Sequence, residues 1–339
     1  MPSEESRHGL HVEHPRYPVA PKVGMSAAPL ALCAAVLPFL RRQIRDGRDF
    51  DLIDAHYFYP DGVGAVLLGR ALDRPVIVTA RGSDLNVIAQ HSVPRSWIRW
   101  AARHADGLVA VSGGLKRRLV ELGVGADRVR VLRNGVDLAM FHPYDREAAR
   151  ARLGLMRPSL LAVGNLVALK RHCLMVEALA YLPEVGLVIV GEGPERARIE
   201  RVARDHKVVD RVRLLGRVPQ DRLPEIYSAA DLLLLVSTHE GWPNVLLESM
   251  ACGTPVVVSP MDGIADIVSS AEAGRILADD TPNGLASAIR ELLAVLPSRA
   301  ATRLYAEQFD WQSTTAGQIA LFHEILERRS KAQCRKIRR

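Results

Sequence analysis

The residues best suited to chemistry in this chain are two glutamates, Glu240 and Glu248, which stand eight positions apart. Glu240 lies in a turn rich in Gly, Pro and Asn at residues 237–243. Glu248 falls one turn into the short helix that we expect over residues 245–252. A carboxylate there can accept two hydrogen bonds from a vicinal diol such as a ribose, and the open helix N-terminus suits a phosphate. The spacing therefore fits a ligand that carries sugar hydroxyls and a diphosphate together.

Both carboxylates also have a purely structural interpretation, because the helix dipole favours acids near helix starts. Glu240 would then be a capping acid and Glu248 a solvated helix residue. The elements around them are clear. Residues 231–236 and 255–258 predict short buried strands, since they are almost entirely apolar. Asn244 is the expected N-cap of the helix between them, and Gly253 is its expected stop. This is a strand, turn, helix and strand of a parallel α/β sheet.

The stretch resembles the E-x7-E signature of retaining glycosyltransferases of family four, which have the GT-B fold. Four further segments resemble motifs of that family in the expected order: the domain junction at 133–143, VGNLVALK at 163–170, VGEGP at 190–194 and LGRVP at 215–219. The resemblance covers about residues 50–325. It implies two Rossmann-like domains whose parallel sheets face each other across a cleft, and transfer of a hexose from a nucleotide diphosphate sugar.

The resemblance also implies roles for individual residues. Glu240 would touch the donor hexose, Glu248 the nucleotide ribose and Lys170 the diphosphate. Arg81 stands where many members have His, and it could neutralise a donor phosphate but cannot act as a base. With Glu240 and Lys170 it completes the catalytic candidates. The other donor-side candidates are Asn165, which replaces the usual Arg and brings no charge, and Gly191, Gly193, Arg217, Trp242, Asn244 and Val245.

Two residues of the first half are candidates for the acceptor side. His56 and Asp84 follow predicted buried strands, so they would lie at the carboxyl ends where α/β sheets bind ligands. A structural polar role at a strand end is the alternative for His56. The segments HYFYPDG and ARGSDLN around them resemble a branch linked to teichuronic-acid, capsule or exopolysaccharide assembly. The expected acceptor is therefore a hydroxyl of a glycan or a lipid-linked glycan.

Short buried strands alternate with helices through both halves of the chain, which predicts parallel sheets covered on both faces. We expect strands at 51–55, 76–79, 108–111, 129–132, 160–163, 187–190, 212–215, 232–236 and 256–258. The predicted domains are an acceptor-side domain at 1–142 and a nucleotide-sugar domain at 143–310. A C-terminal helix at 311–327 either crosses back to the first domain or caps the second, and a basic tail follows at 328–339.

The first 25 residues depart from the family pattern. Full-length members begin with a strand and a glycine-rich loop, whereas Pro15, Pro18, Pro21 and scattered His residues here predict irregular chain. We interpret this as the loss of the first strand-helix unit, through truncation, a mis-assigned start or degeneration. That loss would leave a sheet edge open and remove part of the acceptor site.

Composition narrows the possible partners. The net charge of +7 equals the seven basic residues within 328–339, so the body of the protein is neutral and shows no sign of nucleic-acid binding. The tail is expected to be a solvated, disordered end, or else to contact an anionic membrane face. The apolar stretch at 27–40 is shorter than the ~20 residues that span a bilayer, and it predicts a helix.

No cofactor or metal is expected besides the donor. The four cysteines are far apart without a C-x-x-C, and neither a P-loop nor a G-x-G-x-x-G occurs. The predicted location is cytoplasmic, with peripheral contact at the inner membrane face as the extension. Two other functions remain open, namely a sugar-nucleotide epimerase and a degenerate module that binds nucleotide sugar without catalysis.

Overall fold

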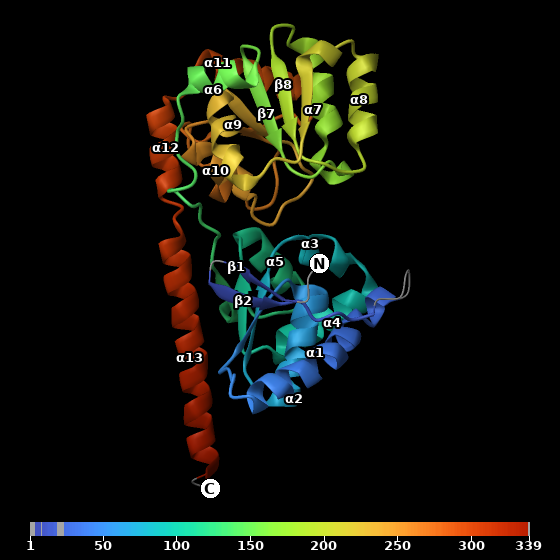
Figure 1. The fold of residues 1–339 in the computed structure, drawn as a ribbon, viewed down its shortest axis with the longest axis vertical. Coiled ribbons are helices and arrows are strands. Elements are labelled where there is room, and N and C mark those ends of the chain that lie inside the picture. Colours follow the sequence, from blue (N-terminus) through green and yellow to red (C-terminus); the bar gives the residue numbers. More distant parts are fainter. Residues whose placement is uncertain (1–3, 8, 19–23, 338–339) are drawn as a thin grey trace. The chain divides into compact units, whose positions relative to one another are not determined.

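The computed structural model describes residues 4–7, 9–18 and 24–337, which form two compact α/β units (Figure 1). The first unit comprises Met1–Arg133 and Ala316–Arg339, and the second comprises Asn134–Thr315. Residues 134–142, which were predicted to end the first domain, thus group with the second unit.

The second unit is built on a six-stranded parallel sheet with the order β12-β11-β10-β7-β8-β9. Its strands are β7 (Ser159–Val163), β8 (Gly186–Val190), β9 (Val212–Gly216), β10 (Leu232–Leu235), β11 (Val256–Val258) and β12 (Gly274–Ile276), the last of which the sequence did not predict. The chain order reverses between β7 and β10, which lie side by side. This is the topological switch point at which open α/β sheets bind ligands.

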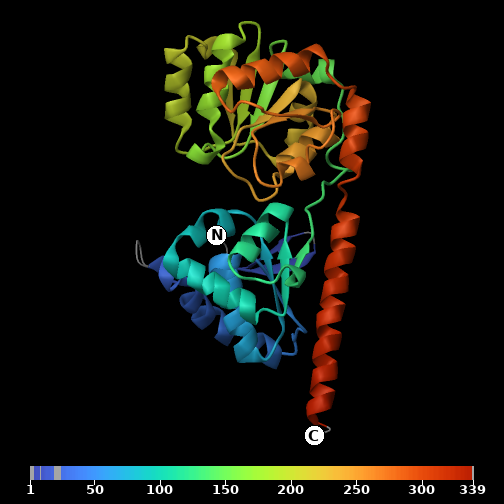
Figure 2. The same ribbon diagram turned by 180° about the vertical axis from the view of Figure 1, so that it is seen from behind.

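Helices cover both faces of this sheet (Figures 1 and 2). They are α6 (Arg146–Leu153), α7 (His172–Ala178), α8 (Arg196–Asp205), α9 (Leu223–Ala229), α10 (Asn244–Ala251), α11 (Pro282–Ala294) and α12 (Arg299–Glu307). The strands between them are apolar without alternation, and Leu160, Ile189 and Leu232 are fully buried. Continuous apolar runs are what a parallel sheet needs when both of its faces are covered.

The first unit contains a four-stranded parallel sheet in sequence order. Its strands are β3 (Ile53–His56), β4 (Val76–Ala80), β5 (Gly107–Ala110) and β6 (Val129–Val131). Its helices are α1 (Ala28–Arg45), α2 (Val63–Leu72), α3 (Ser83–Asn86), α4 (Ser92–His104) and α5 (Gly113–Glu121). The predicted helix at 27–40 is confirmed by α1. In the part of the chain that the structure describes, no helix has both the length and the apolar character needed to cross a membrane.

The last helix, α13 (Trp311–Ile337), packs along the first unit. Leu321 and Ile325 join a buried cluster with Ile77 of β4 and Val109 of β5. The helix continues to Ile337, so the prediction of a disordered tail is wrong for residues 328–337, and Arg338 and Arg339 lie outside the described residues. Its basic residues find acids within the same unit: Arg328 pairs with Glu324, Arg329 with Asp73, and Lys331 with Glu327 at 3.5 Å.

The N-terminal segment holds a hairpin that the sequence did not reveal. Strands β1 (Glu4–Arg7) and β2 (Leu10–Glu13) pair antiparallel, so the expectation of irregular chain is wrong there, while Pro21 lies outside the described residues. β1 is polar throughout, and β2 alternates apolar and polar residues over only four positions, with Leu10 exposed, so neither strand gives a clear sequence signal. Within the described residues, no segment before β3 pairs with the four-stranded sheet. The loss of a first strand-helix unit stays a prediction.

Candidate active site

The switch point of the second unit brings two predicted catalytic residues into contact. Lys170 ends the loop that follows β7, and Glu240 lies in the loop that follows β10. The Lys170 ammonium donates to Glu240 Oε1 at 2.6 Å, and both side chains are less than one fifth exposed. The backbone N–H of Thr238 donates to the Leu169 carbonyl at 2.9 Å and holds the two loops together. An ammonium and a carboxylate thus sit where a ligand of this sheet would bind.

Two predicted donor-site glycines hold the neighbouring loop against the Lys170 loop. A Cβ on Gly191, whose φ is +141°, would lie 1.9 Å from the Gly164 carbonyl oxygen. A Cβ on Gly193 would lie 2.4 Å from the carbonyl oxygen of Leu166. Only glycine permits this close approach of the two backbones. The VGEGP turn and the VGNLVALK loop therefore form one surface, on which the side chain of Asn165 is exposed.

Glu248 is anchored in the second unit by a buried tyrosine. The hydroxyl of Tyr227, on α9, donates to Glu248 Oε2 at 2.8 Å. Burial raises the pKa of the Glu248 carboxyl, and the hydrogen bond from Tyr227 opposes that rise. The interpretation of Glu248 as a solvated helix residue is wrong. A carboxylate has about four acceptor positions, so one hydrogen bond leaves capacity for a ligand diol.

The start of α10 differs from its prediction. The helix begins at Asn244, and Pro243 occupies the N-cap position without a side-chain hydrogen bond, so the assignment of Asn244 as the cap is wrong. The Asn244 side-chain oxygen instead accepts from Asn134 Nδ2 at 3.1 Å. Trp242 is buried, with its ring centroid 6.4 Å from that of Phe309, whereas Val245 is half-buried. The ring of Trp242 therefore fixes the loop before the helix.

Two other predicted residues lie exposed at strand ends. Arg217 directly follows β9 in the second unit, and Arg81 directly follows β4 in the first. His56, at the end of β3, is also exposed, and its Nε2 lies 3.2 Å from Asp54 Oδ2. Asp54 Oδ2 in turn accepts from Gln318 Nε2 at 2.6 Å, which links the strand end to α13.

Asp84 has a different role from the predicted acceptor contact. Its carboxylate is fully buried and accepts backbone N–H groups of Phe58 at 2.8 Å, Gly82 at 2.7 Å and Leu85 at 3.1 Å. The N–H of Arg81 adds a fourth donor at 3.2 Å. These donors fill the acceptor positions of a carboxylate. Asp84 thus positions the loop that directly follows His56 at the end of β3, and the loop after β4, which carries Arg81.

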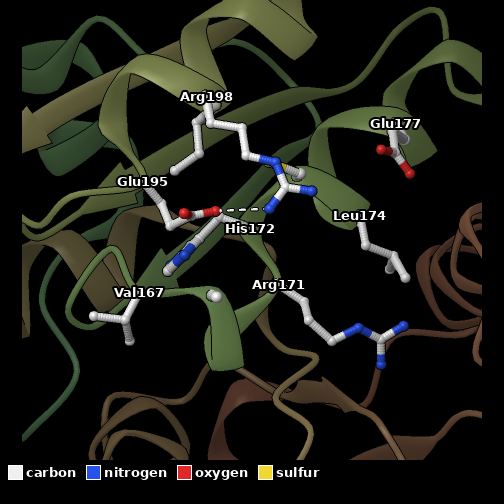
Figure 3. Close-up of a pocket in the computed structure, with 10 residues that line it drawn as sticks. Val167, Arg171, His172, Leu174, Glu177, Glu195 and Arg198 are labelled. Carbon is white, nitrogen blue, oxygen red and sulfur yellow. Dashed lines mark hydrogen bonds and ion pairs between the residues drawn. The ribbon is translucent and has the colours of Figure 1, made fainter.

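A cavity of about 250 Å³ beside the Lys170 loop was missed by sequence reasoning (Figure 3). His172 in its wall is buried, and burial together with the charge of Lys170 lowers the pKa of its imidazole to about 4. Arg198 pairs with Glu195 at 2.9 Å, and Arg171 pairs with Asp280 at 2.5 Å, so each arginine at this wall has an acidic partner. The neutral imidazole adjoins the loop that carries Lys170, and its position two residues after Lys170 was its one sequence signal.

Comparisons with known proteins agree with this architecture. The family model described as "Glycosyltransferase Family 4" matches residues 2–140, and the model described as "Glycosyl transferases group 1" matches residues 145–309. A D-inositol 3-phosphate glycosyltransferase of Acidothermus cellulolyticus is 34% identical over 336 residues, which cover 90% of this chain and 74% of that protein. The chain belongs to the family-four glycosyltransferases.

Solved structures support the GT-B fold of this glycosyltransferase. Sucrose-phosphate synthase from Thermosynechococcus elongatus has a TM-score of 0.80 at 23% identity, over 96% of this chain and 86% of that one. Anabaena HepE, solved in complex with UDP-glucose, has a TM-score of 0.72 at 20% identity, over 87% and 82% of the two chains. The prediction of two Rossmann-like domains with parallel sheets is confirmed. Among the described residues of the glycosyltransferase, no group of three His, Cys, Asp or Glu side chains is placed to hold a metal ion.

Proposed function

We propose that this glycosyltransferase moves a hexose from a UDP-sugar to a hydroxyl of a glycan or lipid-linked glycan, with retention of configuration and without a metal or other cofactor. The observation that carries the proposal is the pair formed by Lys170 and Glu240 at the switch point of the second unit. The UDP-glucose complex of HepE, which shares this fold, supports the choice of UDP as the nucleotide.

The chemistry requires stabilisation of a departing diphosphate. The ammonium of Lys170 supplies a positive charge close to the ligand, in a partly buried place where charge acts more strongly than in water. The N-terminus of α10, which no side chain caps, adds backbone N–H donors. Asn165 contributes a hydrogen bond without charge, so Lys170 carries most of this task, with Arg81 as the candidate from the first unit.

Glu240 and Glu248 have separate roles in this proposal. Glu240 orients the donor hexose, and Glu248, held by Tyr227, accepts the ribose hydroxyls. Glu240 is not assigned as a glycosidase-type nucleophile, because its carboxylate is paired with Lys170. The resemblance of the HYFYPDG and ARGSDLN segments supports a place in the assembly of cell-envelope polysaccharide.

The test is transfer from radiolabelled UDP-glucose to a panel that includes lipid-linked glycans and D-inositol 3-phosphate. Conversion of the donor without any acceptor would favour the epimerase, and donor binding without transfer or hydrolysis would favour the degenerate module.

Calorimetry on variants tests the residue assignments. Glu248→Ala should weaken UDP-glucose binding, whereas Lys170→Ala should chiefly lower turnover. Glu184→Gln removes one charge from an exposed position of the same unit and serves as the control. An affinity unchanged in Glu248→Ala would overturn the ribose assignment.

A further inference from the structure

The first unit contains a basic cavity that is lined by none of the candidate active-site residues. It has a volume of about 420 Å³ and lies against α3, α4 and α5. That volume falls within the range of small-molecule sites, about 300–1,000 Å³. Figure 1 shows these three helices together in the first unit. None of the strand-end candidates, His56, Arg81 and Asp84, lines the cavity.

Three arginines and one glutamate line this cavity: Arg95 and Arg99 from α4, and Arg118 and Glu121 from α5. Arg118 donates to Glu121 at 3.0 Å, and that pair cancels one positive charge. Arg95 donates to the backbone carbonyls of Ala89 at 2.7 Å and Gln90 at 2.8 Å. Those carbonyls fix the guanidinium in place but do not neutralise it.

Arg99 completes the positive charge. Across the residues that the structure describes, no carboxylate pairs with Arg99, and its Nη2 lies 3.7 Å from the Cβ position of Gly123. The three arginines and the one glutamate together leave an excess of two positive charges around the cavity. Buried Leu85 and Ala89 give it an apolar side as well.

We propose that this cavity binds the phosphate group of a small phosphorylated molecule or of a phospholipid. Guanidinium groups recognise phosphate through paired hydrogen bonds, and an excess of two positive charges suits either the dianion of a phosphate monoester or the monoanion of a phospholipid diester. The apolar side accommodates the carbon skeleton to which the phosphate is attached.

The site also has a route to the proposed acceptor side. Leu85 follows Asp84, whose carboxylate fixes the loop that carries Arg81. A ligand that contacts Leu85 and Ala89 would therefore also restrain residues 81–89, at the end opposite to Arg81. Binding at the cavity does not depend on the donor proposal, because every residue named belongs to the first unit.

The experiment compares Arg99→Gln with Arg103→Gln. Arg103 lies one turn further along α4, is exposed and does not line the cavity, so the two variants lose the same charge from the same helix. The probes are glucose 6-phosphate and inorganic phosphate, measured by calorimetry at low and high salt, and phosphatidylglycerol vesicles beside phosphatidylcholine vesicles, measured by co-sedimentation. UDP affinity is measured in parallel on both variants.

We expect Arg99→Gln to weaken binding of the phosphate-bearing probe about tenfold and Arg103→Gln to weaken it less than about twofold. UDP affinity should stay the same in both. A response to glucose 6-phosphate identifies a soluble ligand, and a response confined to phosphatidylglycerol identifies a lipid headgroup. Equal losses in the two variants, or no binding of any probe at millimolar concentration, would overturn the proposal and leave the donor proposal untouched.

Discussion

The pairing of Lys170 with Glu240 predicts that a substitution inside the proposed active site strengthens UDP binding instead of weakening it. If Lys170 receives the donor diphosphate, the phosphate must compete with a carboxylate that already lies 2.6 Å from the ammonium. Replacing that carboxylate by an amide, in Glu240→Gln, removes both the competitor and a negative charge that repels the phosphate. UDP should therefore bind more tightly to this variant, although Glu240 belongs to the proposed active site.

The geometry sets the size of the effect. Two unit charges 4 Å apart attract by roughly 4 kcal/mol at an effective dielectric constant of about 20, and desolvation offsets most of this. Neighbouring groups in one network couple by about 0.5–3 kcal/mol. Because both side chains are less than one fifth exposed, we expect the loss of the Glu240 charge to make the free energy of UDP binding more favourable by about 1–2 kcal/mol. This corresponds to a roughly five- to thirtyfold gain in UDP affinity.

The assay is calorimetry of UDP and of UDP-glucose on wild type, Glu240→Gln and the control Glu184→Gln at one ionic strength. Glu240→Gln should gain affinity for UDP and lose part of its preference for UDP-glucose over UDP, because the proposed hexose contact is weakened. Turnover should fall. UDP affinity equal to wild type or lower would refute the reasoning, since Glu240 would then not compete with the phosphate for Lys170.

Three further predictions concern the framework of the site. The pKa of His172 is lowered from 6.5 to about 4 in the folded protein, so the unfolded chain takes up this proton at a higher pH and acid favours unfolding. The wild type should therefore lose about 3 kcal/mol of stability between pH 6.5 and 4 through this group, and His172→Asn should not show that loss. The exposed replacement His206→Asn serves as the control and should leave the loss in place. Asp84→Asn should lower the free energy of unfolding in urea by about 3 kcal/mol, against less than about 0.5 kcal/mol for exposed Asp127→Asn, and an equal loss in both would contradict the loop-anchoring role. Gly191→Ala should lower both Tm and UDP affinity more than Gly154→Ala, which also has positive φ but no backbone atom near its Cβ position; similar losses would show that strain in φ, not collision with Gly164, decides the effect.

The sequence by itself determined the kind and order of the main elements. Runs such as residues 232–235 are apolar at every position, which marks a strand buried on both faces and hence a parallel α/β sheet. It also supplied the family, because E-x7-E and four other motifs occur in order, and it pointed to Lys170, Glu240 and Glu248. These signals are local, and each can be seen in a window of a few residues.

Tertiary structure alone decided how those residues meet. Lys170 and Glu240 are 70 positions apart, and they pair because β7 and β10 lie side by side at the point where the strand order reverses. Asp84 has the residue type and the position of a ligand-binding residue, yet backbone N–H groups from two loops occupy the acceptor positions of its carboxylate. The polar hairpin, buried His172 and the Tyr227 support of Glu248 were equally hidden from the sequence. Pairing between distant strands and the burial of single polar groups depend on the whole packed unit, so no local pattern records them.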